Sequence, residues 1–296
     1  MTSADVIYNC PFVPAEWIKA HGLRPVRLNP RPSWGMHILG QIEGICPYAL
    51  AFANHAAACD AGLVVFTTRC DQMRRVYELW KVCTGRPAFL LNLPTCRQSA
   101  AAQRFYIDEL LRLGRYMEQF GGRRPTKPIL AQIMLQANQD LETPVSPNRG
   151  AVPVAILGGP LMNTDMVLFD TLASGGAYVV FDGTQGGTRC IHRPFDRREL
   201  CEDPLQELAL AYLDIPDVFF RPNDGLYRWL KAQIDDTAVR GLILHHYIWC
   251  DKWKAECWRI RQWLPIPTVV LSNDGQTGLD SPGIRNRLSA FLEAIR

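Results

Sequence analysis

The sequence has little net charge and no long apolar run, and both absences narrow the class of protein. Its 32 lysines and arginines against 29 aspartates and glutamates leave a net charge of +3. Because the basic residues are scattered, we expect no nucleic-acid partner. No apolar run is long enough to cross a bilayer, and residues 1–12 lack the basic start and apolar core of a secretory signal. We therefore expect no membrane partner and a cytoplasmic location.

Short motifs for several common cofactors are also missing. No CxxC pair occurs among the ten cysteines, which argues against zinc ribbons and ferredoxin-type clusters, because those sites draw ligands from one short loop. No GxGxxG, GKS or GKT motif occurs, which argues against a bound dinucleotide or nucleoside triphosphate. The glycine-rich segments Leu157–Pro160 and Gly183–Thr188 fit tight turns after strands.

What is present indicates two α/β domains. The chain has 296 residues, 48% hydrophobic and 21% charged, which is enough for sizeable cores. Short apolar runs alternate with segments of helical length, the pattern of parallel sheets covered by helices on both faces. The predicted strands are Val26–Leu28, Leu63–Thr67, Ala88–Leu93, Val154–Leu157, Tyr178–Phe181, Leu242–Tyr247 and Thr268–Ser272. The predicted helices are Pro14–Ala20, Pro47–Ala58, Asp71–Val82, Ala100–Phe120, Thr164–Ala173, Pro204–Leu213, Leu226–Ile234, Asp251–Trp263 and Ser281–Ile295.

The segment Glu142–Gly150 carries two prolines, a glycine and several polar residues, so it is the expected domain boundary. The prediction is an N-terminal α/β domain over residues 1–143, which carries Cys46 and Cys70. A C-terminal α/β domain over residues 144–296 carries Cys250.

Three of the ten cysteines stand where a predicted strand passes into a predicted helix. Residues 68–74 (TRCDQMR) and 248–254 (IWCDKWK) repeat one Cys-Asp corner in the two halves of the chain. Pro47, at a first helical position, places Cys46 at a helix start as well. The other cysteines need no disulfides in a reducing compartment, and buried thiols act as small apolar residues.

These corners predict a ligand site, because such turns lie at the carboxyl edge of an open α/β sheet. Helix N-termini favour anions, and an iron–sulfur cluster held by thiolates is an anion. Three thiolates, from Cys46, Cys70 and Cys250, would leave one iron of a four-iron cluster open to water or substrate. Three alternatives stay open: incidental buried thiols, a zinc site, and a nucleophilic cysteine paired with a histidine. The histidines are His21, His37, His55 and His192, which share no spacing, and His245 and His246, which lie in an apolar strand.

Several ordered motifs resemble one family, the 2-hydroxyacyl-CoA dehydratase and benzoyl-CoA reductase subunits with the related double-cubane cluster proteins. Residues 10–26 (CPFVPAEWIKAHGLRPV) are similar to a segment near the start of those proteins. Three cysteine motifs resemble the segments that supply cluster ligands in the family, namely Gly44–Tyr48, Thr67–Asp71 and Trp249–Asp251. Later segments resemble its second domain, namely Val154–Pro160, Ser174–Val180, Ile266–Val269, Asp274–Gln276 and Arg287–Leu292.

The resemblance implies two Rossmann-like domains with a 4Fe–4S cluster in the cleft between them, held by Cys46, Cys70 and Cys250. It also implies a paralogous subunit or a second copy as partner, a separate ATP-dependent iron–sulfur activator, and an acyl-CoA or aryl-CoA substrate. In the dehydratases a low-potential electron reduces the thioester carbonyl to a ketyl radical, which expels the neighbouring hydroxyl. In the reductases the electrons enter an aromatic ring or a similar acceptor. The protein contributes positioning and electrostatics, and the cofactor the hard step.

The chain also departs from the family. It is shorter than most family subunits, and Ala15 precedes Glu16 where the family often has a second acid. Cys10 is a possible extra ligand if the cluster is a larger double cubane, with Cys190 and Cys257 as weaker candidates. We assign four cysteines to packing, namely Cys59, Cys83, Cys96 and Cys201. We interpret four basic residues as solvated surface, with contact to a CoA phosphate as the alternative, namely Arg69, Arg74, Arg189 and Arg193.

The residues leave the substrate, the catalytic residues and the substrate-binding residues unknown. A non-catalytic electron-relay or partner subunit is the second hypothesis. A metal-free α/β binding protein is the third.

Overall fold

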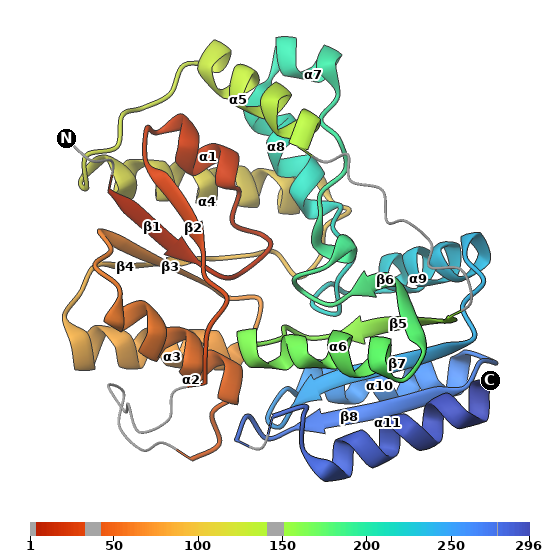
Figure 1. The fold of residues 1–296 in the computed structure, drawn as a ribbon. Coiled ribbons are helices and arrows are strands. Elements are labelled where there is room, and N and C mark those ends of the chain that lie inside the picture. The colour runs from red at the N-terminus through yellow and green to blue at the C-terminus, as the bar shows by residue number, and fades with distance from the viewer. Residues whose placement is uncertain (1–3, 33–42, 141–150, 277) are drawn as a thin grey trace.

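Two parallel sheets, each sandwiched between helices, make up the fold (Figure 1). The computed structural model describes residues 4–32, 43–140, 151–276 and 278–296. The expected boundary at 142–150, with its division after residue 143, lies outside these residues. The predicted fold class, two Rossmann-like α/β units with parallel strands, is confirmed.

The first sheet has the strand order β2-β1-β3-β4, with all neighbours parallel. Successive side chains along a strand point to opposite faces, so β1, β3 and β4 each contribute to two apolar cores. Helices α2 and α3 cover one face, and α1 and α4 cover the other. The bounds are β1 (Asp5–Tyr8), α1 (Ala15–Ala20), β2 (Arg24–Arg27), α2 (Pro47–Ala58), β3 (Leu63–Thr67), α3 (Asp71–Thr84), β4 (Ala88–Leu91), α4 (Ala100–Glu118) and α5 (Lys127–Asp140).

The second sheet repeats this plan with the order β6-β5-β7-β8. Helices α6 and α11 cover one face, and α9 and α10 cover the other. The bounds are β5 (Val152–Gly158), α6 (Val167–Ser174), β6 (Ala177–Gly183), α7 (Arg197–Glu202), α8 (Pro204–Leu213), α9 (Asp224–Asp236), β7 (Gly241–Tyr247), α10 (Asp251–Trp263), β8 (Thr268–Asn273) and α11 (Pro282–Ile295). Short 3₁₀ turns cover Asn163–Met166 and Thr188–Cys190.

A segment from the second half of the chain packs on the first sheet. In Figure 1, α7 and α8 lie beside α4 and α5, away from the second sheet. Leu208 and Tyr212 of α8 join the same buried cluster as Leu110 of α4. The Tyr212 hydroxyl also donates a hydrogen bond of 2.6 Å to the buried Glu16 carboxylate of α1. Helices α7 and α8 therefore belong to the second half of the chain but pack with the first sheet and its helices.

Three elements were not among those predicted. Strand β1 has only four residues and begins with a charged one, so its apolar run is too short to stand out in the sequence. It is nevertheless a central strand, paired with both β2 and β3. Helix α5 buries only Leu130 and Met134, and α7 only Leu200, so neither has a wide apolar face.

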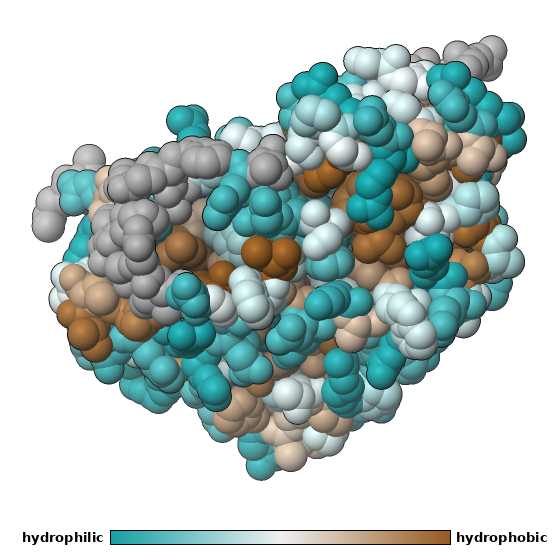
Figure 2. All heavy atoms as spheres, turned by 90° about the horizontal axis from the view of Figure 1, so that it is seen from below, coloured by the Kyte–Doolittle hydropathy of each residue, from teal (hydrophilic) through white to brown (hydrophobic). Residues whose placement is uncertain are grey.

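None of the described helices combines the length and apolar character needed to span a membrane. The face seen in Figure 2 is mixed, with brown apolar patches separated by hydrophilic residues.

Candidate metal centre

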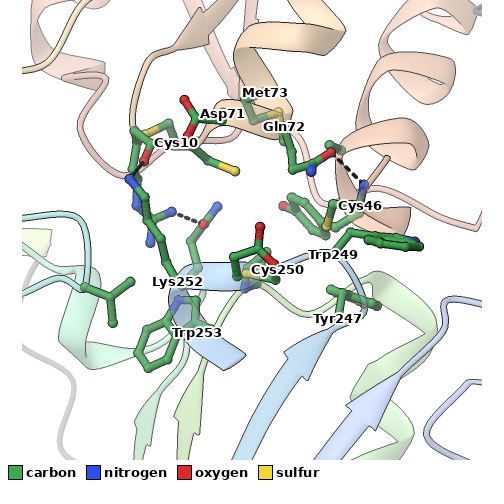
Figure 3. A pocket seen from close by; sticks show the side chains of 18 of the residues that line it. Cys10, Cys46, Asp71, Gln72, Met73, Tyr247, Trp249, Cys250, Lys252 and Trp253 are labelled. Atoms are coloured by element: carbon green, nitrogen blue, oxygen red, sulfur yellow. Dashed lines mark hydrogen bonds between the residues drawn. The ribbon is translucent and has the colours of Figure 1, made fainter. Parts of the chain in front are cut away.

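The predicted cysteines lie in one cavity between the two halves of the chain (Figure 3). Cys46, Cys70 and Cys250 all line it, and so does Cys10. In Figure 3, Cys10 and Cys46 approach from the upper, N-terminal half, and Cys250 approaches from the lower half. The cavity volume is about 100 Å³, several times the space that one water needs.

The cavity lies where the strand order reverses in each sheet. In the first sheet the chain leaves β1 for β2 on one side, while β3 lies on the other side. In the second sheet β5 and β7 have the same relation. The lining residues follow the carboxyl ends of these strands: Cys10 after β1, Cys70 after β3, Pro160 after β5 and Cys250 after β7. Such switch points are where open α/β sheets bind ligands, and here two of them share one cavity.

Each of the three corner cysteines is the N-cap residue of a helix. Cys46 precedes α2 with a proline in its first turn, Cys70 precedes α3, and Cys250 precedes α10. None of their side chains accepts a capping hydrogen bond, so the sulfurs do not cap the helix starts. The Cys46 N–H donates to Gln72 Oε1 at 3.0 Å, which joins the starts of α2 and α3. The predicted helix starts are confirmed, and three positive helix ends surround the cavity.

The thiols interact electrostatically. Burial raises the pKa of Cys46 well above its ordinary value, and the neighbouring Cys250 and Cys70 raise it further. Burial raises the pKa of Cys250 to about 12, and Cys70 adds to that effect. Burial also raises the pKa of Cys10. The thiols of Cys10, Cys46 and Cys250 therefore stay protonated, and a metal that binds them must displace their protons.

Next to the thiols is a buried charge cluster, which we define as Arg69, Arg189 and Asp217. The Asp217 carboxylate accepts from Arg69 Nη2 at 2.5 Å and from Arg189 Nη1 at 2.8 Å. Burial opposes the charge of Asp217, but the two guanidiniums hold its pKa well below its ordinary value. Two cations and one anion leave one positive charge beside the cavity. Lys252, whose pKa is lowered by burial, also lines the cavity.

The two halves are tied together around the cavity. Lys252 Nζ donates to the Arg69 carbonyl at 2.9 Å, and Gln185 Nε2 donates to the Asn9 carbonyl at 2.9 Å. Both bonds connect residues more than 170 positions apart. Their ends lie beside Cys70 and Cys10, so these contacts help to fix the separation of the thiols.

Trp249 has a strained backbone directly before Cys250. Its φ of 65° is the only positive value of a non-glycine residue among those the structure describes. Its indole is 51% exposed, so burial of the side chain does not account for the strain. Left-handed conformations of non-glycine residues cluster at functional sites, where surrounding structure enforces them. Here the strained residue directly precedes Cys250 and lines the same cavity.

The donor set consists of thiols, the kind of ligand that an iron–sulfur group takes. Within the described ranges, no three histidine, cysteine, aspartate or glutamate side chains are grouped closely enough to hold one metal ion. Cluster ligands bind different irons, so their sulfurs stand further apart than the ligands of one ion. Thiolates are the ligands that such clusters take, and the excess positive charge beside them suits an anionic group.

Of the other cysteines considered as ligands or packing residues, only one lines the cavity. Cys10 joins the cavity, whereas the buried Cys190 and Cys257 do not line it. The assignment of four cysteines to packing is wrong for three that are exposed, namely Cys83, Cys96 and Cys201, while Cys59 is partly buried against the α2 and α3 core. No described histidine lines the cavity, so a Cys–His pair has no support there, and His37 lies outside the described residues.

The interpretation of the basic residues as solvated surface is wrong for Arg69 and Arg189. The Arg69 side chain is largely buried, that of Arg189 is fully buried, and both pair with Asp217. Arg74 is exposed, and Arg193 pairs with Glu207. Sequence reasoning missed Asp217 and Gln185. Asp217 lies in the loop after α8, where no local pattern distinguishes it. Gln185 lies after β6, in the glycine-rich segment Gly183–Thr188, which the sequence predicts as a tight turn.

The family model for the 2-hydroxyglutaryl-CoA dehydratase D-component matches residues 10–143 and residues 130–295. The chain belongs to this family. The resemblance inferred from the sequence is thereby confirmed, and all three corner cysteines lie inside the matched residues. A D-component of this family is a subunit of a dehydratase-like enzyme complex, so a partner component belongs to its function. A search of curated proteins found no match to the chain.

Proposed function

We propose that this D-component family member carries a 4Fe–4S cluster on Cys46, Cys70 and Cys250. In that role it would deliver low-potential electrons to a CoA thioester, for dehydration or reduction. The observation that carries this proposal is the convergence of three helix-capping cysteines, two from one half of the chain and one from the other, on one cavity. Such a cluster, when bound, supplies single electrons and an iron with no protein ligand.

The residues around the thiols have definable roles. The three helix starts and the net positive charge of the buried charge cluster would stabilise a negatively charged group. Aromatic and aliphatic side chains make most of the remaining wall, including Tyr48, Tyr247 and Trp253. Because they keep water away, hydrogen bonds and charges at the sulfurs act more strongly than they would in solvent. Cys10 would be a further ligand if the cluster is a double cubane.

Partners follow from the same proposal. As the family resemblance implies, a separate ATP-dependent iron–sulfur activator would supply the single electrons, and a paralogous subunit or a second copy would complete the complex. The acyl-CoA or aryl-CoA substrate would approach the iron that the three cysteines leave free.

A non-catalytic electron-relay subunit is the second candidate, and the cavity lining favours it in one respect. Dehydration needs a base for the β-proton, and Asp217 is occupied by two arginines. The other carboxylates on the described lining, Asp71 and Asp251, are exposed to solvent. A base for proton removal would then come from the partner subunit.

The direct test is anaerobic reconstitution of the full chain with iron and sulfide. We expect about four iron and four sulfide per chain, or about eight of each for a double cubane, with sulfur-to-iron charge-transfer absorbance. Cys46→Ser, Cys70→Ser and Cys250→Ser should each lower iron retention, whereas Cys83→Ser, an exposed thiol outside the cavity, should not. Equal iron content in Cys250→Ser and Cys83→Ser would overturn the proposal.

A second measurement separates the two candidates. With the reduced cluster observed by electron paramagnetic resonance, an added acyl-CoA should change the signal if this subunit meets substrate. An unchanged signal, with the iron content intact, would assign the chain to electron relay.

A further inference from the structure

A second cavity lies among α1, α4, α5 and α8, away from the cysteines. Its volume is about 340 Å³, more than that of the cysteine cavity. Its floor is apolar, with Trp17 from α1, Leu130 from α5 and Pro204 from α8. A cavity with an apolar floor and a few polar groups is the usual form of a small-molecule site.

One buried polar side chain, His21, lines this cavity. His21 is only 2% exposed, and its Nδ1 lies 2.8 Å from the Trp17 carbonyl oxygen. Burial lowers the pKa of His21 below its ordinary value, so the ring is neutral at pH 7. The Nδ1–H therefore donates to the Trp17 carbonyl, which leaves Nε2 as the acceptor of the neutral ring.

The neighbouring helix provides space for the ring. An added Cβ at Gly114 of α4 would stand 2.8 Å from His21 Nε2 and 3.2 Å from Trp17 Cζ2. Both Gly114 and the two rings line the cavity. Any larger residue at position 114 would fill the space beside this nitrogen.

Charged side chains form the rim. Arg115, Arg124 and Lys127 contribute three cations, against the carboxylates of Glu118 and Asp203. Neither arginine has an ion-pair partner among the residues that the structure describes. Lys127 Nζ donates to the Glu202 carbonyl, and Asp203 caps α8 by accepting from the Gln206 N–H. The two arginines are therefore available to an anion.

We propose that this cavity binds a small carboxylate whose apolar body lies against Trp17, whose hydroxyl or N–H donates to His21 Nε2, and whose carboxylate contacts Arg124 and Arg115. Guanidinium and carboxylate groups match in a planar, two-bond geometry, which selects carboxylates. The site stands on residues that do not touch the cysteine cavity, so it is independent of the proposed cluster.

The test uses three small probes on the full chain, measured by isothermal titration calorimetry. 4-Hydroxybenzoate carries both groups that the site should recognise. Benzoate lacks the donor for His21 and should bind about fivefold more weakly. 4-Hydroxybenzyl alcohol lacks the carboxylate and should bind at least about tenfold more weakly.

Two substitutions assign any binding to this cavity. Arg124→Gln should weaken 4-hydroxybenzoate about tenfold, whereas Arg123→Gln, a neighbour that does not line the cavity, should leave affinity unchanged. Gly114→Ala should abolish binding, with thermal unfolding measured alongside to show that the chain is folded. No binding of 4-hydroxybenzoate at millimolar concentration, or equal effects of the two arginine substitutions, would overturn the proposal.

Discussion

The buried charge cluster provides the sharpest test of the packing between the two halves. Asp217 is fully buried and accepts four hydrogen bonds, two from Arg69, one from Arg189 and one from the Phe219 N–H. Arg69 directly precedes Cys70 in the first half of the chain, whereas Arg189 and Asp217 belong to the second half. Asp217→Asn keeps the shape of the side chain but removes its charge. It also turns an N–H group toward guanidinium donors.

The magnitude follows from burial. The Asp217 and Arg189 side chains are 0% exposed and that of Arg69 is 11% exposed, so solvent screens their interaction weakly. Removing one partner of a buried ion pair costs about 3 to 5 kcal/mol, because the remaining charge stays buried without compensation. The matched control is Asp5→Asn, whose partner Arg24 is largely exposed. Exposed pairs contribute at most about 1 kcal/mol.

Urea unfolding at pH 7, followed by far-ultraviolet circular dichroism, measures both variants against the parent chain. We expect the free energy of unfolding to fall by about 3 to 5 kcal/mol for Asp217→Asn and by less than about 1 kcal/mol for Asp5→Asn. A loss below about 1 kcal/mol for Asp217→Asn would refute the argument that two arginines depend on this carboxylate.

Three further predictions concern the fold. Burial lowers the pKa of His245 to about 3, so the folded state excludes a proton that the unfolded state binds below about pH 6.5. Stability should therefore fall with pH between about 6.5 and 3, more steeply in the parent chain than in His245→Gln, and equal slopes in urea titrations would contradict this. Gly158→Ala would place a Cβ 2.2 Å from the His245 carbonyl oxygen and should greatly reduce the yield of folded protein. Gly186→Ala has open space for the added Cβ and should leave the yield of folded protein unchanged. Similar melting temperatures for Gly158→Ala and Gly186→Ala would refute this prediction. Ser99→Ala removes the hydroxyl that caps α4 by accepting from the Ala102 N–H. It should lower the free energy of unfolding in urea by about 1 kcal/mol, and an unchanged value would show that the cap does not stabilise the helix.

Local signals made several features predictable. The bounds of β3, α2, α8 and α10 agree with the sequence prediction, because apolar runs, N-terminal prolines and acidic first turns mark them. The repeated Cys-Asp corners at Cys70 and Cys250 were found in the same way, since each follows a strand and opens a helix.

Other features depend on contacts between distant parts of the chain. Strand β1 is short, and its central place comes from pairing with two neighbours. Helix α8 was predicted as a helix, but its packing against α4 and α5 could not be, because its apolar face does not identify its partner. The exposure of Cys83, Cys96 and Cys201 was missed, since composition does not say which small residues are covered.

The amino-acid sequence by itself determined the α/β class and the placing of three thiols at helix starts, because periodicity, proline and acidic first turns act over a few residues. The family followed from the resemblance of its ordered motifs. Only the tertiary structure decided that these thiols face one cavity and that Asp217 holds Arg69 and Arg189 beside them. It also decided that His21 borders a separate cavity. Each of these depends on how two sheets and their helices pack, and packing is set by complementary surfaces far apart in the chain.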